Sequence, residues 1–299
     1  MKYNNALEST IRILFLIIIS WSTSLQAIEV VDDLARKIQL SKPAQRIISL
    51  APNVTELLFE AGAGDKIIGV VQYSNFPEAA KNVPRIGGHE KLDLELIISM
   101  KPDLVIGWQT GNQESELLKL QRLGFKVFIT EPRELMDIAS LLERFGQLAG
   151  TEKIAKQAAI RFTQQYQLLK QRYKERKSLR VFYQIWDQPL MTVNGQHLIS
   201  DVMRLCGLEN IFANVGTLVP RINQESVIEA DPQLIVAGGM GKVRPDWTKQ
   251  WQRWTDLSAI RLNALLDIQP DIIQRHSPRI LQGAEELCVY ADSIRKKLD

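Results

Sequence analysis

The sequence lacks the local patterns that most often mark an enzyme active site. It contains no Gly-x-Ser-x-Gly elbow, no Gly-rich phosphate loop ending in Lys-Ser or Lys-Thr, and no Gly-x-Gly-x-x-Gly turn. Its three histidines, His89, His197 and His276, lie far apart and share no metal-ligand spacing. These absences indicate a protein that is not an enzyme and has no metal or other cofactor of its own. Two alternatives stay open: an exported α/β enzyme that uses His89 or His276, and a metal site built from both with a carboxylate.

Charge of one sign is not in excess either. The 299 residues hold 37 Lys and Arg against 34 Asp and Glu. Residues 1–27 contain two basic residues and one acidic residue, so the chain without them keeps 35 basic and 33 acidic side chains. A balance this even gives no reason to expect binding to nucleic acid.

Long hydrophobic runs are absent after the first residues of the chain. Lys2 and Arg12 precede an apolar run over 13–19, and Ala27 is a small residue before an expected cleavage point. We therefore expect a signal peptide over 1–27 and export of the mature protein. An uncleaved anchor is the alternative, although the run is short for a membrane span. A lipid anchor is not expected, because no cysteine follows the run.

Cysteine is scarce, and export changes how the two cysteines are interpreted. Cys206 and Cys288 do not have Cys-x-x-Cys spacing, which gives little support to a redox-active pair. Oxidising compartments favour disulfides, and both residues fall in segments expected to be helical. We expect a disulfide between them, with two buried free thiols as the alternative.

What the sequence does contain is a regular alternation of short apolar strands and helices. Such alternation predicts parallel strands joined by right-handed crossovers, which is the α/β class. Strands are expected at 46–50, 67–71, 104–108 and 126–130 in the first half, and at 179–185, 234–238 and 265–266 in the second. Helices are expected at 55–61, 92–100, 114–123, 135–148, 196–206, 224–230, 246–257 and 278–298.

One uninterrupted helix is expected between the two halves, over 151–177. Gly150 ends the preceding helix, Thr151 suits an N-cap, and apolar residues from Ile154 to Tyr173 recur at helical spacing. At 1.5 Å per residue this helix spans about 40 Å. We expect it to bridge an N-terminal lobe over 28–150 and a C-terminal lobe over 178–299, two Rossmann-like lobes with mostly parallel sheets. An ordinary surface helix of one domain is the alternative.

An internal sequence repeat supports two related lobes. The segment 95–106, ELIISMKPDLVI, matches 225–236, ESVIEADPQLIV, with Glu, Ile, Pro and Leu at the same offsets. Each copy predicts a helix, a turn marked by proline and a buried strand. Glu95 and Glu225 open the two copies.

Flat apolar side chains follow several of the expected strands. Open α/β sheets bind ligands at the carboxyl ends of their strands. In the first half these positions hold Tyr73, Phe76, His89 and Trp108, and in the second half they hold Trp186, Met191, Val219 and the segment 271–275. Two lobes facing each other would line a cleft for a large, planar, partly polar ligand. For each aromatic taken alone, core packing is the alternative.

Several motifs resemble the periplasmic cobalamin-binding proteins of ABC importers, within the helical-backbone class that also serves siderophores and haem. The resemblance is carried by RIISLAPNVTELLFEAG from Arg46, by YSNFP at 73–77, by KPDLVI at 101–106, by CGLENIF at 206–212 and by RHSPRI at 275–280. It covers nearly the whole chain from Arg46. It implies two α/β lobes bridged by one helix, a periplasmic location and delivery of a ligand to a membrane permease.

The resemblance also implies roles for individual residues. It gives Tyr73 and Trp108 as cleft aromatics, and Asp271 and Arg275 as contacts to polar groups of a corrin. Cys206 and Cys288 match a family disulfide. Glu95 and Glu225 match two surface glutamates, one in each lobe, that meet arginines of the permease.

Three positions depart from the family pattern. His89 and Val219 stand where cobalamin binders have tryptophans, and Ile185 stands for a phenylalanine, with Trp186 adjacent. These residues complete the expected ligand site. We expect a monomeric solute-binding protein for cobalamin or a related corrinoid. A ferric siderophore or haem is the alternative ligand, since His89 offers a nitrogen to iron or cobalt.

Overall fold

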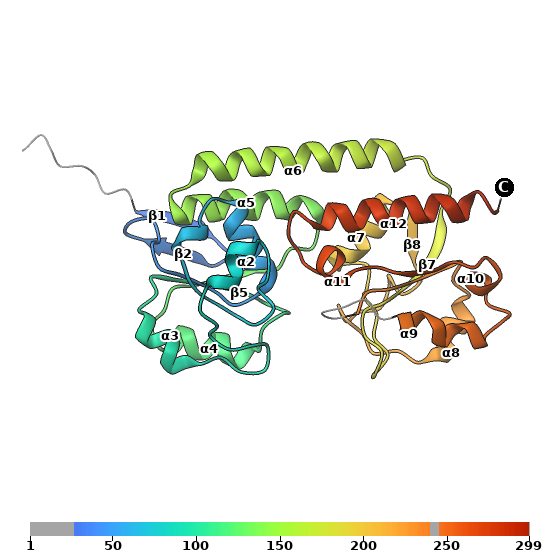
Figure 1. The fold of residues 1–299 in the computed structure, drawn as a ribbon, viewed down its shortest axis with the longest axis horizontal. Coiled ribbons are helices and arrows are strands. Elements are labelled where there is room, and N and C mark those ends of the chain that lie inside the picture. The colour runs from blue at the N-terminus through green and yellow to red at the C-terminus, as the bar shows by residue number, and fades with distance from the viewer. Residues whose placement is uncertain (1–26, 240–244, 299) are drawn as a thin grey trace, which may run out of the picture.

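The computed structural model describes residues 27–239 and 245–298, and these form two α/β lobes side by side beneath a long helix (Figure 1). The expected signal peptide lies outside the described residues apart from Ala27. The N-terminal sheet is wholly parallel, in the order β4-β3-β5-β6. Its strands are β3 (Ile47–Ser49), β4 (Ile67–Val70), β5 (Leu104–Trp108) and β6 (Val127–Thr130).

The C-terminal sheet repeats this plan. Its order is β10-β9-β7-β8, again wholly parallel, so in both sheets the second strand of the lobe flanks the first and the third lies on the other side. Its strands are β7 (Leu179–Gln184), β8 (Leu208–Asn210), β9 (Leu234–Ala237) and β10 (Leu265–Asp267). The α/β class with two parallel sheets is confirmed. The short strand β8 was not predicted.

Helices cover both sheets. They are α2 (Pro52–Glu60), α3 (Leu94–Met100), α4 (Glu114–Arg122), α5 (Leu135–Ala149), α7 (Leu198–Leu205), α8 (Gln224–Ala230), α9 (Pro245–Lys249), α10 (Ser258–Arg261), α11 (Pro270–Ile273) and α12 (Ile280–Arg295), with 3-10 turns at 64–66, 78–82 and 250–253. The single helix predicted over 246–257 is wrong. The chain forms α9 and a 3-10 turn, then becomes extended at Leu257, the residue before α10.

The predicted bridge exists as α6 (Glu152–Tyr173), which ends four residues before the expected end at 177. Its inner face buries Ala155, Ala158, Ala159, Phe162, Leu169 and Tyr173. Ile154, expected on this face, is 49% exposed instead. Helices α5 and α6 approach closely where Gly146 of α5 faces Ala155 of α6. A Cβ added at Gly146 would lie 2.4 Å from the Cβ of Ala155, so there is no room for a side chain there.

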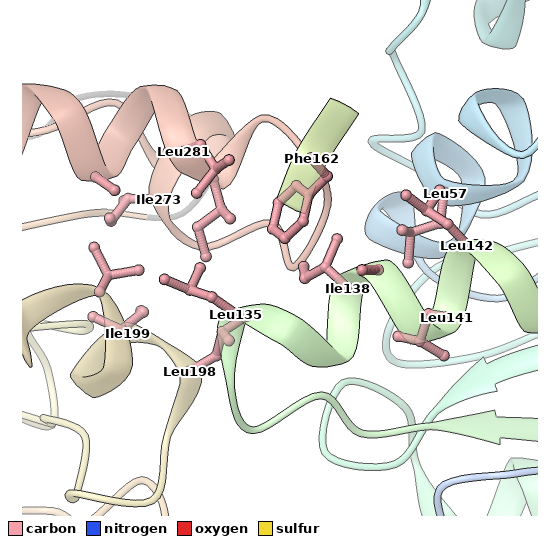
Figure 2. Close-up of a cluster of buried hydrophobic side chains, with 14 of the residues drawn as sticks. Leu57, Leu135, Ile138, Leu141, Leu142, Phe162, Leu198, Ile199, Ile273 and Leu281 are labelled. Atoms are coloured by element: carbon pink, nitrogen blue, oxygen red, sulfur yellow. The ribbon is translucent and has the colours of Figure 1, made fainter. Parts of the chain in front are cut away.

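Helix α5 is a second connection between the lobes. Figure 2 shows Leu135 at the start of this helix near Leu198, Ile199, Ile273 and Leu281 of the C-terminal lobe, Ile138 beside Phe162 of α6, and Leu142 farther along the helix near Leu57 of α2. The backbone N–H of Leu135 also donates to Asp201 of α7 at 2.8 Å. These residues belong to one hydrophobic core that runs through both lobes. The lobes are therefore joined by packing as well as by the covalent bridge.

Each lobe carries one further stabilising feature. An antiparallel hairpin of β1 (Ile28–Val31) and β2 (Lys37–Leu40), which was not predicted, belongs to the N-terminal lobe. The expected disulfide between Cys206 and Cys288 is confirmed and links the end of α7 to α12. Among the described helices, none combines the length and apolar character that a membrane crossing requires.

Candidate ligand site at the junction of the lobes

The topology places a switch point in each sheet. From β3 the chain goes to β4 on one side and then crosses to β5 on the other side of β3. The crevice outside the carboxyl ends of β3 and β5 is therefore the expected ligand position. The same reversal occurs between β7 and β9 in the second sheet. The candidate site is therefore built from the segments that follow these strands.

In the N-terminal lobe, three predicted residues lie on such segments. Trp108 is the last residue of β5 and is half-buried. Tyr73 follows β4, adopts a positive φ of 65° and is 70% exposed. His89 is exposed in the next loop, where its Nδ1 lies 3.0 Å from the carbonyl oxygen of Gly111. Because a carbonyl only accepts, Nδ1 is the donor in this contact.

In the C-terminal lobe, Ile185 and Trp186 follow β7 directly, and both are half-buried. The Trp186 ring packs edge-on against Trp247 at 5.7 Å, and its Nε1 donates to the carbonyl of Gln188 at 3.0 Å. Val219 is half-buried in the loop between β8 and α8. Asp271 lies in α11, and Arg275 follows it.

The two lobes meet where these segments come together. The Trp108 ring contacts His276 edge-on, with centroids 4.8 Å apart. Arg275 donates through Nη2 to the backbone carbonyl of Tyr73 at 3.1 Å. Tyr73 and Trp108 of one lobe thus lie against residues 275–276 of the other, at the carboxyl ends of both sheets.

Arg275 has surroundings that the sequence did not suggest. Its side chain is buried and pairs with Glu56 of α2 at 2.8 Å and with Asp271 at 2.9 Å. Ser277 and Arg279 donate to the same Glu56 carboxylate at 2.6 Å each. Glu56, Ser277 and Arg279 were missed as site residues, because nothing in the sequence connects α2 with a segment more than two hundred residues later.

The histidines differ sharply in their environment. His197 and His276 are buried with ring centroids 5.3 Å apart, whereas His89 is exposed. Burial and the charge of Arg133 lower the pKa of His197 to about 3. Burial, together with His197 and Arg133, holds the pKa of His276 well below its usual value. No group of three or more His, Cys, Asp or Glu side chains suited to a metal ion occurs in the described part of the chain.

Several buried polar groups at the junction have no hydrogen-bond partner among the described residues. They are both polar atoms of the Asn53 amide, Nε1 of Trp108 and Nδ1 of His276. Asn53 lies in the first turn of α2, directly after β3, and Trp108 ends the neighbouring β5. Unpaired buried polar atoms are rare, and at a switch point they are suited to a water molecule or a polar group of a ligand.

Glu95 and Glu225 occupy equivalent places in the two lobes. Each is exposed and is the second residue of a seven-residue helix, α3 or α8. Asp93 and Asn223 cap these helices in the same way, accepting from Leu96 N and Ser226 N. Figure 1 shows α3 and α8 in the half of each lobe remote from α6. The repeated segments of the sequence are thus repeated structural units.

Comparison with known proteins agrees with this architecture. A vitamin B12-binding protein of Vibrio cholerae serotype O1 is 34% identical over 255 residues, covering 85% of this chain and 92% of the relative. A vitamin B12-binding protein of Yersinia pestis is 37% identical over 254 residues, covering 85% and 89%. The crystal structure of the periplasmic vitamin B12-binding protein of Vibrio cholerae matches with a TM-score of 0.79 at 34% identity, covering 85% of this chain and 99% of the other. The family model for periplasmic binding proteins matches residues 47–272, and the chain belongs to the periplasmic binding protein family.

Proposed function

We propose that this protein captures cobalamin or a related corrinoid between its lobes in the periplasm and presents it to the permease of an ABC importer. The meeting of Tyr73 and Trp108 with residues 275–276 at the carboxyl ends of both sheets carries this proposal. The relatives named for vitamin B12 binding match most of the chain at 34–37% identity and support this ligand class.

The chemistry of the junction suits a corrinoid. Such a ligand is broad and flat and carries amide groups at its edge. Flat aromatic faces contribute binding area, and a few placed polar groups set the orientation. The unpaired polar atoms of Asn53, Trp108 and His276 supply such groups.

Calorimetric titration of the mature protein with cyanocobalamin tests the proposal. We expect one molecule bound per chain, with a negative heat-capacity change from buried apolar surface. Haemin and a ferric hydroxamate, titrated in parallel, are the comparison ligands. Heat with either of them and none with cyanocobalamin would reject the corrinoid assignment.

Haem is the second candidate ligand, and His89 is the observation that favours it. With Nδ1 donating to the Gly111 carbonyl, Nε2 is the nitrogen that the neutral ring can offer to a metal, and the side chain is exposed. It is therefore available to the metal centre of a haem or of a corrinoid. Absorption spectra of the loaded wild type and of His89→Ala separate the cases, since loss of a histidine ligand shifts the spectrum of the bound metal.

The docking role of Glu95 and Glu225 follows from their placement, one on each lobe. An exposed carboxylate on each lobe can pair with a two-fold partner and set the orientation and rate of docking. Replacing both by alanine should impair uptake into cells while ligand affinity stays unchanged. Glu152→Ala is the matched control, because Glu152 is also exposed in a first helical turn but lies on α6. Wild-type uptake by the double variant would remove the docking role.

Signal-peptide cleavage, the monomeric state and the absence of chemistry on the ligand can each be measured directly. Mass spectrometry of the periplasmic protein should give a chain beginning at Ile28, and light scattering should give a monomer. Cyanocobalamin recovered after incubation should be chemically unchanged, as expected of a binding protein. A modified corrinoid, or zinc bound in the purified protein, would favour an enzyme instead.

A further inference from the structure

A cluster of charged side chains joins the two lobes at the candidate site. At its centre is Glu56 in α2, whose side chain is only 2% exposed. Its carboxylate accepts from Arg275 Nη1 at 2.8 Å, from Ser277 Oγ at 2.6 Å, and from Arg279 Nε at 3.0 Å and Nη2 at 2.6 Å. We call Glu56, Arg275, Ser277 and Arg279 the inter-lobe clamp. All but Glu56 belong to the C-terminal lobe.

Both terminal nitrogens of Arg275 are engaged within the protein. Nη1 donates to Glu56 and to Asn75 Oδ1 at 2.7 Å, and Nη2 donates to the Tyr73 carbonyl at 3.1 Å and forms an ion pair with Asp271 at 2.9 Å. An arginine carries two N–H groups on each terminal nitrogen, so the two hydrogen bonds of Nη1 use both of its N–H groups, while Nη2 lies between a carbonyl and a carboxylate. The residue is also 9% exposed. In this arrangement Arg275 contacts the loop that bears Tyr73, and its charge is neutralised on both sides.

The Tyr73 loop, residues 72–77, is held at several other points. Arg279 stacks over the Phe76 ring, with the guanidinium carbon 3.9 Å from the centroid. Ser74 contacts Thr55, the neighbour of Glu56 in α2, at 3.1 Å. The loop therefore contacts α2 of its own lobe and two arginines of the other lobe, Arg275 and Arg279.

The conformation of Tyr73 explains why such support is needed. Its φ of 65° lies in the left-handed region, which is unfavourable for a residue other than glycine and persists only where the surrounding contacts enforce it. The Tyr73 side chain nevertheless remains exposed, because the clamp contacts the loop without covering it. The arrangement holds the backbone in a strained shape while leaving the ring free to meet a ligand.

From this geometry we propose that Arg275 is a positioning residue that acts through the Tyr73 loop and does not itself bind the ligand. The clamp residues of the C-terminal lobe hold the Tyr73 loop of the N-terminal lobe in place. Tyr73 is therefore correctly placed only when the two lobes are packed against each other as in this structure. This inference rests on the proposed function for its ligand, although its structural part concerns the ligand-free protein.

A double-mutant cycle with cyanocobalamin distinguishes a positioning role from direct contact. Arg275→Lys keeps the charge beside Glu56 but loses the forked donors, and Tyr73→Ala changes an exposed side chain. We expect Arg275→Lys to weaken binding about tenfold, and the double variant to be no weaker than the weaker-binding single variant. Multiplication of the two fold-changes would show independent contacts with the ligand and overturn the proposal. Arg180→Lys, at an exposed arginine remote from the junction, is the matched control and should bind as wild type.

Hydrogen exchange in the absence of ligand provides the second readout. Arg275→Lys and Glu56→Gln should both speed exchange at residues 72–77, because each weakens the clamp. Unchanged exchange there would reject the positioning role, even if binding falls. Should the wild type fail to bind cyanocobalamin, the proposed function fails, and the exchange measurement still decides the role of Arg275.

Discussion

The two lobes share one strand order but are stabilised by different means. In the N-terminal lobe the hairpin β1–β2 adds a small antiparallel layer, and Asp32 at its turn accepts from Arg36 and from Ile129 N of β6. In the C-terminal lobe a disulfide joins α7 to α12, and Arg295 donates to the carbonyls of Cys206 and Gly207 beside it. A repeated topology therefore does not require repeated stabilising contacts.

The lobes also differ in what they bring to their junction. The N-terminal lobe contributes the exposed Tyr73 ring, the Trp108 face and one buried acid, Glu56. The C-terminal lobe contributes two arginines and two buried histidines. A buried acid on one side and two arginines on the other make the charges of this junction complementary rather than symmetric, so variants in the two lobes should affect different contacts.

The largest difference expected between the lobes comes from the disulfide. Cys206 and Cys288 are separated by 82 residues, and loss of a link that closes a loop of this size destabilises a domain by about 2–4 kcal/mol. Cys206→Ser with Cys288→Ser should lower the free energy of unfolding in urea by this amount. Hydrogen exchange should rise in α7 and α12 but not in α3 and α4. An equal rise in both lobes would show that the shared core transmits the loss.

Acid should weaken the C-terminal lobe selectively. His197 and His276 are buried and remain neutral in the folded protein, with pKa values below the ordinary 6.5, whereas the unfolded chain takes up protons once the pH falls below 6.5. The unfolded state then binds more protons, so stability decreases as the pH falls. The expected loss between pH 7 and pH 5 is about 2 kcal/mol for His197, and His276 adds to it in the same direction.

Urea unfolding at the two pH values measures this dependence. His197→Asn is the informative variant, because asparagine can still cap α7, where His197 Nδ1 accepts from Ile199 N at 3.1 Å. It should remove the contribution of His197 to the pH effect, about 2 kcal/mol. A pH dependence identical to that of the wild type would assign the effect to other groups.

The parts of the fold that sequence could predict are those with strong local signals. The strands β5 and β9 are continuous apolar runs because parallel strands are covered on both faces, and α6 has a long periodic stripe without glycine or proline. The hairpin was missed because its strands, Ile28–Val31 and Lys37–Leu40, include charged or polar residues and are not continuous apolar runs. The same holds for β8, whose three residues are Leu, Glu and Asn.

The candidate site was predictable only in part, for a similar reason. Tyr73, Trp108 and Trp186 could be selected because each follows an apolar strand, and this order is local. The role of Arg275 depends on Glu56, which lies 219 positions earlier. In the sequence Glu56 cannot be distinguished from any other glutamate in a helix. The bridging role of α5 likewise depends on which residues its first turns meet, and periodicity does not reveal that.

A comparison of the two tryptophans sharpens the difference between the lobes at the ligand site. Trp108→Ala should weaken ligand binding by about 1–3 kcal/mol if its face stacks on the ligand. Trp186→Ala should cost less, because that ring is already engaged by Trp247 and the Gln188 carbonyl. Calorimetry with cyanocobalamin measures both. Trp108→Phe keeps a stacking face but removes the unpaired Nε1, so it separates stacking from hydrogen bonding. A larger loss for Trp186→Ala would place the main stacking surface in the C-terminal lobe.

The smallest expected effect tests whether the repeat extends to energetics. Asp93→Ala and Asn223→Ala each remove a side-chain acceptor from the third backbone N–H of a seven-residue helix, at a cost of about 1 kcal/mol. The two losses should be equal if the repeated units are equivalent, and serine at either position should restore most of the stability. Because Glu95 and Glu225 lie in the first turns that these caps hold, fraying should also reduce uptake while ligand affinity stays unchanged. A loss of uptake from only one of the two variants would mean that docking depends mainly on that lobe, despite the matching placement of the glutamates.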